Sequence, residues 1–441
     1  MENAAEKIQE YVETLPLLDT HEHLTAREEL RDRQTDVLQE YLIHYFNRDL
    51  LSAGLRPSDL KIATQHALPL LQRWKILQPY WDIARFTGYG RALDIAARGL
   101  YGLDGISTAT IERLNDCFLG SLKPGHFAHV LHNRSRIKVC LLDKQDQVDL
   151  NTDNLGADPT FFRPVYRLDT FIYPRLLGDI QKVEQDLNTD ICSFQDWQEA
   201  CELSLDRAVS HGMIALKSGL AYERPLLYER VTHAEAERSF NSVLERRHLP
   251  DWLAAPVVTD KAFQDYMMHF VLGLANRREL AFQFHTGLQE GNGNYILTSD
   301  PALLSNLFLQ YPKVRFDLFH IGYPFQHVLS ALAKNFPNVF IDMCWAHIVS
   351  PEASVRALEE WLDAVPYNKI SAFGGDYAIV DAVYGHQVLA RRNVSRTLGR
   401  KISEGCFDVQ TARVIARRLL YDNPMEIFRL QQKGIAEDTE K

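Results

Sequence analysis

The stretch LPLLDTHEH (residues 15–23) is a short apolar run that passes directly into acidic residues and two histidines. Seven similar runs follow, most of them rich in Val, Ile, Leu and Phe, and several come after a Pro or Asn turn signal, which is typical of buried strands. They are Ile137–Asp143, Phe162–Asp169, Met213–Leu220, Leu280–Gly287, Val314–Gly322, Val339–Trp345 and Ile370–Asp376.

Helix-like segments separate these runs. Pro301–Gln310, for example, carries leucines at helical spacing. Alternating strands and helices favour a parallel sheet with crossover helices. Eight such units favour a closed barrel over an open doubly wound sheet. The sequence therefore predicts an α/β fold, a (β/α)8 TIM barrel with a helical insertion after the first strand.

We interpret residues 1–441 as a single barrel domain, because this length suits a large barrel with insertions. The long link at about 24–136 has helical spacing, and a smaller insertion at about 223–262 is helical and charged. The active site of such barrels lies at the carboxyl ends of the strands. We therefore expect the first insertion to cover the mouth of the barrel.

The composition narrows the class of partner. A net charge of -10 argues against a nucleic acid, since phosphate binding needs clustered Lys and Arg. No apolar run reaches membrane-spanning length, and the N-terminus is amphipathic and acidic, unlike a signal peptide. The six cysteines form no CxxC pair, which indicates free thiols. We expect a cytoplasmic enzyme that acts on a small molecule. Both a monomer and a homo-oligomer are compatible with the sequence.

His21 and His23 are the strongest chemical signal. Alternate side chains of a strand face the same way, so both imidazoles point to one side near the carboxyl end of the first strand. Two imidazoles one strand-step apart can share a divalent cation. A lone His-x-His pair is more often one core histidine and one surface histidine. Here, further ligand types recur at matching places in later runs.

His285 ends the fifth run and His320 ends the sixth, each two residues before a glycine. Asp376 ends the eighth run after two glycines, which allow close backbone approach. A carboxylate there can bind metal and accept a proton from bound water, or it can be an ordinary turn residue. Together with the first strand, these residues point at one mouth of the barrel.

Candidate substrate contacts also lie at strand ends. Lys217 sits among apolar residues of the fourth run, so it must pair with a carboxylate or have a perturbed pKa. Substrate binding or structural pairing is favoured over carbamylation, which would create a bridging anion between two metals. Arg163 and Arg167 bind an anionic substrate or pair with acidic neighbours. Tyr222 and Glu290 follow the fourth and fifth runs and are pocket or turn residues.

His21, His23, His285, His320 and Asp376 together resemble the ligand pattern of the amidohydrolase superfamily. The resemblance implies that His21, His23 and Asp376 hold a tightly bound metal and that Asp376 shuttles the proton. It implies that His285 is a ligand or polarises the substrate. It also implies that His320 binds a second metal or contacts the substrate.

Within the superfamily, two likenesses are visible. The KSGLAYE segment and the stretch HIGYPF…FPNVFIDMCWA resemble the domain fused to some glutamine synthetases. The paired-histidine strand, the long helical insertion, the Arg163-Pro164 strand and FHTGLQEGNGN resemble uronate isomerases, whose reaction is an aldose–ketose isomerisation.

From the superfamily resemblance we expect a metal-dependent hydrolase acting on an amide, ester or lactone of a carboxylate-bearing substrate. One or two divalent ions, Zn2+ by expectation, would lower the pKa of bound water from about 15.7 towards roughly 7. Asp376 would take the proton, and His285 would stabilise the oxyanion. The alternative is a non-hydrolytic enzyme with the same site, a uronate-like isomerase or a decarboxylase. A barrel that only binds a ligand is a third reading.

Overall fold

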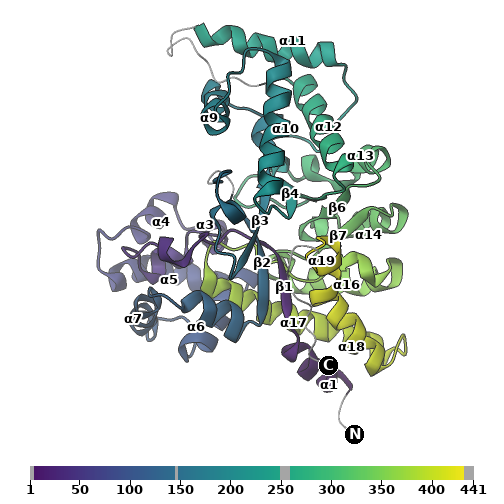
Figure 1. Ribbon diagram of the computed structural model, residues 1–441. Coiled ribbons are helices and arrows are strands. Elements are labelled where there is room, and N and C mark those ends of the chain that lie inside the picture. Colours follow the sequence, from purple (N-terminus) through teal and green to yellow (C-terminus); the bar gives the residue numbers. More distant parts are fainter. Residues whose placement is uncertain (1–3, 145–147, 249–258, 432–441) are drawn as a thin grey trace.

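The computed structural model describes residues 4–144, 148–248 and 259–431. Its centre is an eight-stranded parallel sheet in the order β1 to β8 (Figure 1). The strands are β1 (Leu17–Glu22), β2 (Ile137–Asp143), β3 (Phe162–Arg167), β4 (Ala215–Ser218), β5 (Ala281–Phe284), β6 (Arg315–Leu318), β7 (Val339–Asp342) and β8 (Ile370–Ser371). Each lies inside one of the eight predicted runs, so the predicted barrel is confirmed.

Helices connect successive strands. They are α8 (Asp169–Ile172), α9 (Leu177–Leu187), α10 (Phe194–Ser210), α11 (His233–Leu244), α12 (Lys261–Arg277), α13 (Ser305–Gln310), α14 (Gln326–Asn335), α15 (Ala346–Val349) and α16 (Pro351–Ala364). Helices α9 to α12 extend away from the barrel as a lobe at the top of Figure 1. The predicted insertion at 223–262 contains α11, and its residues 249–258 lie outside the described ranges.

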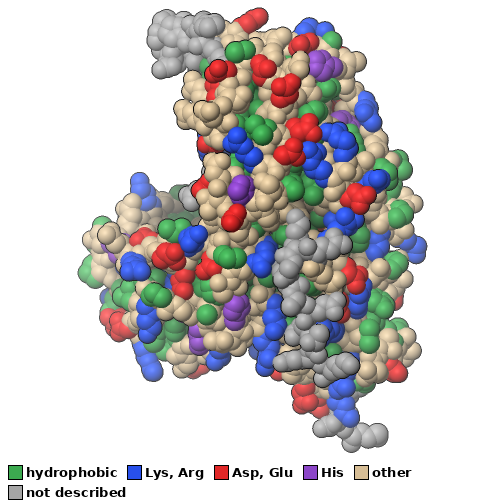
Figure 2. Space-filling model, viewed as in Figure 1, with side chains coloured by type: hydrophobic (Ala, Val, Ile, Leu, Met, Phe, Trp, Pro, Cys, Tyr) green, Lys and Arg blue, Asp and Glu red, His purple; other side chains and the backbone are tan. Residues whose placement is uncertain are grey.

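The segment between β1 and β2 is helical, as predicted. It contains α2 (Val37–Tyr41), α3 (Phe46–Ser52), α4 (Pro57–Ala63), α5 (Leu70–Ala84), α6 (Gly88–Tyr101), α7 (Ile111–Ser121) and the π-helical turn η2 (Ala128–Arg134). These helices gather on one side of the barrel (Figure 1), and Figure 2 shows the outline of the molecule indented between them and the upper lobe. The start of this insertion therefore lies beside the barrel mouth.

The described C-terminal part of the chain contains three α-helices, and the last of them covers the amino end of the barrel. They are α17 (Val380–Ser403), α18 (Val409–Arg417) and α19 (Asn423–Ile427), and α17 packs against α1 (Ala4–Thr14). Tyr421, Met425 and Phe428 pack in one buried cluster with Leu18 and Val139 of the first two strands. We call this cluster the apolar floor of the barrel. Within the described residues, no helix is long and apolar enough to cross a membrane.

The inward-facing side chains change from apolar to polar along each strand. On β4, Ala215 belongs to the apolar floor, and Lys217 lines the cavity at the mouth two residues later. On β5, Ala281 is followed at the same spacing by Gln283 and then by His285. Because inward positions recur every second residue, the strand pattern itself places the polar groups at the carboxyl ends.

Candidate active site

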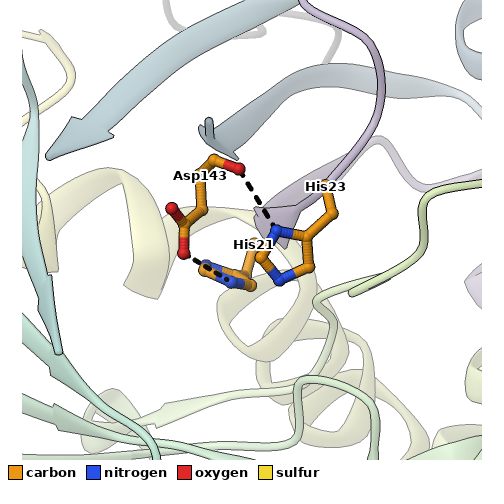
Figure 3. Close-up of side chains that lie close together, drawn as sticks. All are labelled: His21, His23 and Asp143. Atoms are coloured by element: carbon orange, nitrogen blue, oxygen red, sulfur yellow. Dashed lines mark hydrogen bonds and ion pairs between the residues drawn. The ribbon is translucent and has the colours of Figure 1, made fainter. Parts of the chain in front are cut away.

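His21, His23 and Asp143 converge at the ends of the first two strands (Figure 3). The Nε2 atom of His21 lies 3.6 Å from Oδ2 of Asp143 and 3.7 Å from Oδ1 of Asp376. The Nε2 atom of His23 lies 3.2 Å from the same Asp376 oxygen. Two imidazoles and two carboxylates, contributed by β1, β2 and the segment after β8, therefore face one point.

Hydrogen bonds on the far side of each ring fix this orientation. His21 Nδ1 lies 3.3 Å from Oε1 of Gln283, and His23 Nδ1 donates to the backbone carbonyl of Asp143 at 3.2 Å. Metal-binding histidines are held in this way through the nitrogen that does not bind the ion. Nε2 of His21 is buried and has no hydrogen-bond partner in the described part of the chain. These residues thus fit a divalent metal.

A second candidate group lies next to the first. His320, Cys344 and Asp376 each offer one ligand atom, and these atoms lie within 4.8 Å of one another. His320 follows β6 and Asp376 follows β8, and both have positive φ angles, 67° and 56°. Such conformations are uncommon for residues other than glycine and recur at functional sites. Here they turn two side chains into the barrel mouth directly after their strands.

Burial lowers the pKa of His21, His285 and His320, and the pKa of the Asp376 carboxyl is also low. Burial, followed by Lys217 and His23, holds the pKa of His21 well below its usual value. Burial alone would raise the pKa of Asp376, but the hydrogen bond with His23 and the neighbouring rings of His320 and His21 hold that pKa well below its usual range. Neutral imidazole and ionised carboxylate are the forms that bind metal.

His285 occupies a different position from the other histidines. Its Nε2–H donates to the carbonyl of Leu288 at 2.8 Å, and its Nδ1 lies 2.9 Å from Nε2 of His320. The side chain lines the cavity, yet neither candidate metal group of the described residues includes it. Its predicted metal and catalytic roles stay predictions, and its geometry favours contact with the substrate or with His320.

A cavity of about 1010 Å3 opens above these groups. The predicted residues Lys217, Arg167, Tyr222 and Glu290 all line it. The Nζ of Lys217 lies 3.8 Å from the ring centroid of Phe319, and burial, followed by the charge of Arg167, lowers the pKa of the amine. Tyr222 packs against His285 with ring centroids 4.6 Å apart.

Arg163 lies elsewhere. It precedes Arg167 by four residues on the same face of β3, which places it about 13 Å lower, at the amino end of the barrel. Its guanidinium donates to the carbonyls of Pro159 and Phe162 at 2.6 and 2.8 Å. The structure therefore corrects the prediction that Arg163 contacts substrate, because substrate binds at the carboxyl ends of the strands.

Three residues of the site had no assigned role in the sequence interpretation. Asp143 ends the second run, and this place alone could have marked it as a ligand. His44 and Tyr45 belong to the helical insertion, and no sequence motif marks them as site residues. Both line the cavity, and Tyr45 Oη–H donates to the carbonyl of Asp376 at 2.6 Å. The insertion therefore contributes to the site directly.

Comparison with known proteins fits this geometry. The family model described as Amidohydrolase matches residues 230–430. A uronate isomerase of Corynebacterium efficiens is 22% identical over 461 residues, covering 97% of this chain and 95% of that protein. The resemblance to the amidohydrolase superfamily, with a likeness to uronate isomerases, is confirmed. Protein fluG of Emericella nidulans is 25% identical over 262 residues, which span 57% of this chain and only 30% of fluG.

Solved structures of the superfamily share the fold. A uronate isomerase of Thermotoga maritima superposes with a TM-score of 0.79 at 15% identity and covers 97% of this chain and 98% of its own. A glucuronate isomerase of Caulobacter crescentus gives 0.77 at 19% identity, covering 97% and 94%. The coverage shows that the likeness in fold extends over nearly the whole chain.

These comparisons contradict the predicted hydrolase activity. A curated relative that aligns with this chain from end to end is a uronate isomerase, and two further curated relatives that match part of the chain are uronate isomerases too, which are not hydrolytic. The prediction was wrong because paired histidines and a strand-eight aspartate serve several reactions. The metal-ligand residues indicate only that a metal site is present. The reaction depends on the other residues that line the cavity.

Proposed function

We propose that this protein is a metal-dependent isomerase that interconverts the aldose and ketose forms of a uronic acid. The observation that carries the proposal is the end-to-end alignment with a uronate isomerase, which covers 97% of this chain. The cavity supports it, because its lining combines the candidate metal ligands with cationic and hydrogen-bonding side chains. A volume of about 1010 Å3 accommodates an open-chain sugar acid.

His21, His23 and Asp376 would hold the metal, with Asp143 beside them. Two imidazoles with carboxylates suit Zn2+, which we propose as the ion. When bound, a divalent ion supplies Lewis-acid polarisation of a substrate carbonyl or hydroxyl oxygen. Arg167 and Lys217 provide positive charge within the same cavity for the carboxylate of the substrate.

Aldose–ketose isomerisation moves one proton from C2 to C1 and one from the oxygen on C2 to the oxygen on C1, with no loss of atoms. It needs a base and a hydrogen-bond donor side by side. The ionised carboxylate of Asp376 can accept the carbon-bound proton. His44 Nδ1 accepts the N–H of Ala378 at 3.4 Å, which leaves the ring proton on Nε2, where it can serve a substrate oxygen.

Incubation of zinc-loaded protein with a panel of hexuronic acids in D2O tests the proposal. We expect ketose signals in proton NMR spectra and deuterium at the carbon that receives the proton. Asp376→Asn should lower turnover by about 100-fold or more, as is typical for loss of a general base. Absence of ketose across all epimers, with metal bound to the protein, would overturn the proposal.

A further inference from the structure

The seam between β8 and β1 is built differently from the other seven strand junctions. Strand β8 has only two residues, and its ladder partner in the described sheet is β7. Backbone bonds cross the seam at wider intervals: Thr20 N–H donates to Phe373 at 3.2 Å, Asp376 N–H to His21 at 2.8 Å, and His23 N–H to Tyr377 at 3.1 Å. Both halves of the candidate metal site meet at this seam.

Two carboxylates of β1 fill the gaps between these backbone bonds. Oδ1 of Asp19 accepts the N–H of Gly375 at 2.9 Å and the N–H of His21 at 3.2 Å. Oε2 of Glu22 accepts the N–H of Tyr377 at 2.8 Å. The two acids therefore hold the amides on both sides of Asp376, the residue with a φ of 56°.

The local structure of β1 is adapted to this arrangement. Its pairing with β2 is irregular between Asp19 and Glu22, which brings both side chains to the seam although strict alternation would separate them. A Cβ atom on Gly375 would lie 1.7 Å from Oε1 of Glu22. The glutamate thus packs directly on the backbone before Asp376, and only glycine fits there.

Burying two acidic side chains is costly. Both side chains have 0% exposure. The arrangement needs a reason beyond closure of the barrel. Asp19 and Glu22 lie on either side of His21 in sequence, Glu22 directly precedes His23, and both acids bind the backbone that carries Asp376. They therefore link the position of the ligands on β1 to that of the ligand after β8.

We propose that Asp19 and Glu22 are positioning residues that keep Asp376 in register with His21 and His23. This inference rests on the metal-dependent site of the proposed function, and it assigns the two acids no contact with substrate or metal. Loss of either acceptor would release the strained backbone of Asp376 and move its carboxylate away from the histidines, while the ligands themselves stay in the sequence.

The test compares variants that remove or keep the acceptor. Glu22→Met fills a similar volume without an acceptor, and Glu22→Gln keeps an oxygen for the Tyr377 N–H. We expect Glu22→Met to weaken Zn2+ affinity by about 10- to 100-fold, as is typical for partners behind metal ligands, and to lower kcat more than it raises KM. Glu22→Gln should restore most of both. If Glu22→Met does not fold, Asp19→Ala removes the other acceptor.

Asp265→Ala is the matched control. Asp265 is equally buried, accepts the N–H of Glu229 at 2.9 Å and pairs with Arg224, away from the cavity lining. It should lose stability and retain Zn2+ affinity, measured by chelator competition without sugar. Wild-type affinity in Glu22→Met and Asp19→Ala would overturn the inference. Absence of ketose formation with the affinity loss intact would overturn only the isomerase proposal, and absence of Zn2+ binding by the wild type would overturn both.

Discussion

Asp143, which is buried, and Arg167, which is half-buried, form an ion pair at the edge of the candidate metal site. Nε and Nη2 of Arg167 donate to Oδ2 of Asp143 at 2.8 and 2.6 Å, and that oxygen also lies 3.6 Å from Nε2 of His21. Burial alone would raise the pKa of Asp143, but Arg167 and both histidines hold the pKa of this carboxyl well below its usual range. One oxygen thus connects the cationic lining of the cavity with the metal ligands.

Removal of Arg167 should therefore destabilise the protein strongly. Arg167→Ala leaves Asp143 charged and buried without its partner, and we expect the free energy of unfolding to fall by about 3 kcal/mol. Arg163→Ala, on the same strand, should cost only about 1 kcal/mol and leave turnover unchanged. Urea denaturation and steady-state kinetics of both variants provide the measurement. Equal losses in the two variants would contradict this assignment.

The role of the candidate metal ligands can be tested without a substrate. His21→Ala should weaken Zn2+ binding by more than about 100-fold, because loss of a ligand exceeds the usual effect of losing an outer partner. The control is His269→Ala, which removes a buried imidazole bonded to Tyr311 on the outer helices. Metal content after gel filtration, measured by plasma mass spectrometry, should fall in the first variant and persist in the second.

A buried histidine predicts the acid limb of the stability profile. His347 Nε2–H donates to Ala372 before the Asp376 turn, Asn393 donates to its Nδ1, and burial lowers the pKa of His347 from 6.5 to about 4. Because the unfolded state binds the proton first, stability is full above about pH 6.5 and falls as the pH drops towards 4. The contribution should reach about 2 kcal/mol between pH 7 and 5.

His347→Gln should flatten this slope in urea denaturation series at pH 7 and 5. His327→Gln, at an exposed ring on α14, should leave the slope as in the wild type. A His347→Gln protein with the wild-type slope would show that other groups dominate the acid limb.

Substitution of alanine for glycine should change the free energy of unfolding in opposite directions at two positions. Gly375→Ala would place a Cβ atom 1.7 Å from Oε1 of Glu22, so we expect a loss of about 2 kcal/mol or more, with weaker metal binding. Gly120→Ala lies in α7, where no atom is within 4 Å of the new Cβ, and should gain roughly 0.5–1 kcal/mol from helix propensity. Thermal melts of both variants measure the contrast.

Much of the site follows from local pattern. Each of the eight runs contains a strand, because strand period and turn signals act over a few residues. His21, His320 and Asp376 lie at strand ends, and parallel strands of a barrel bring such ends to one mouth. The assignment of the reaction failed for the same reason: ligand types at strand ends are shared by enzymes with different chemistry.

The sequence by itself determined the barrel, the helical insertion and the carboxyl-end position of the paired histidines, since these depend on short-range periodicity. Only the tertiary structure decided that Arg163 lies at the far end from Arg167, that Asp143 joins the site, that His44 and Tyr45 of the insertion line the cavity, and that Asp19 and Glu22 close the β1–β8 seam. Those contacts join residues far apart in the chain. They exist only once the barrel closes and sets the distance between its first and last strands.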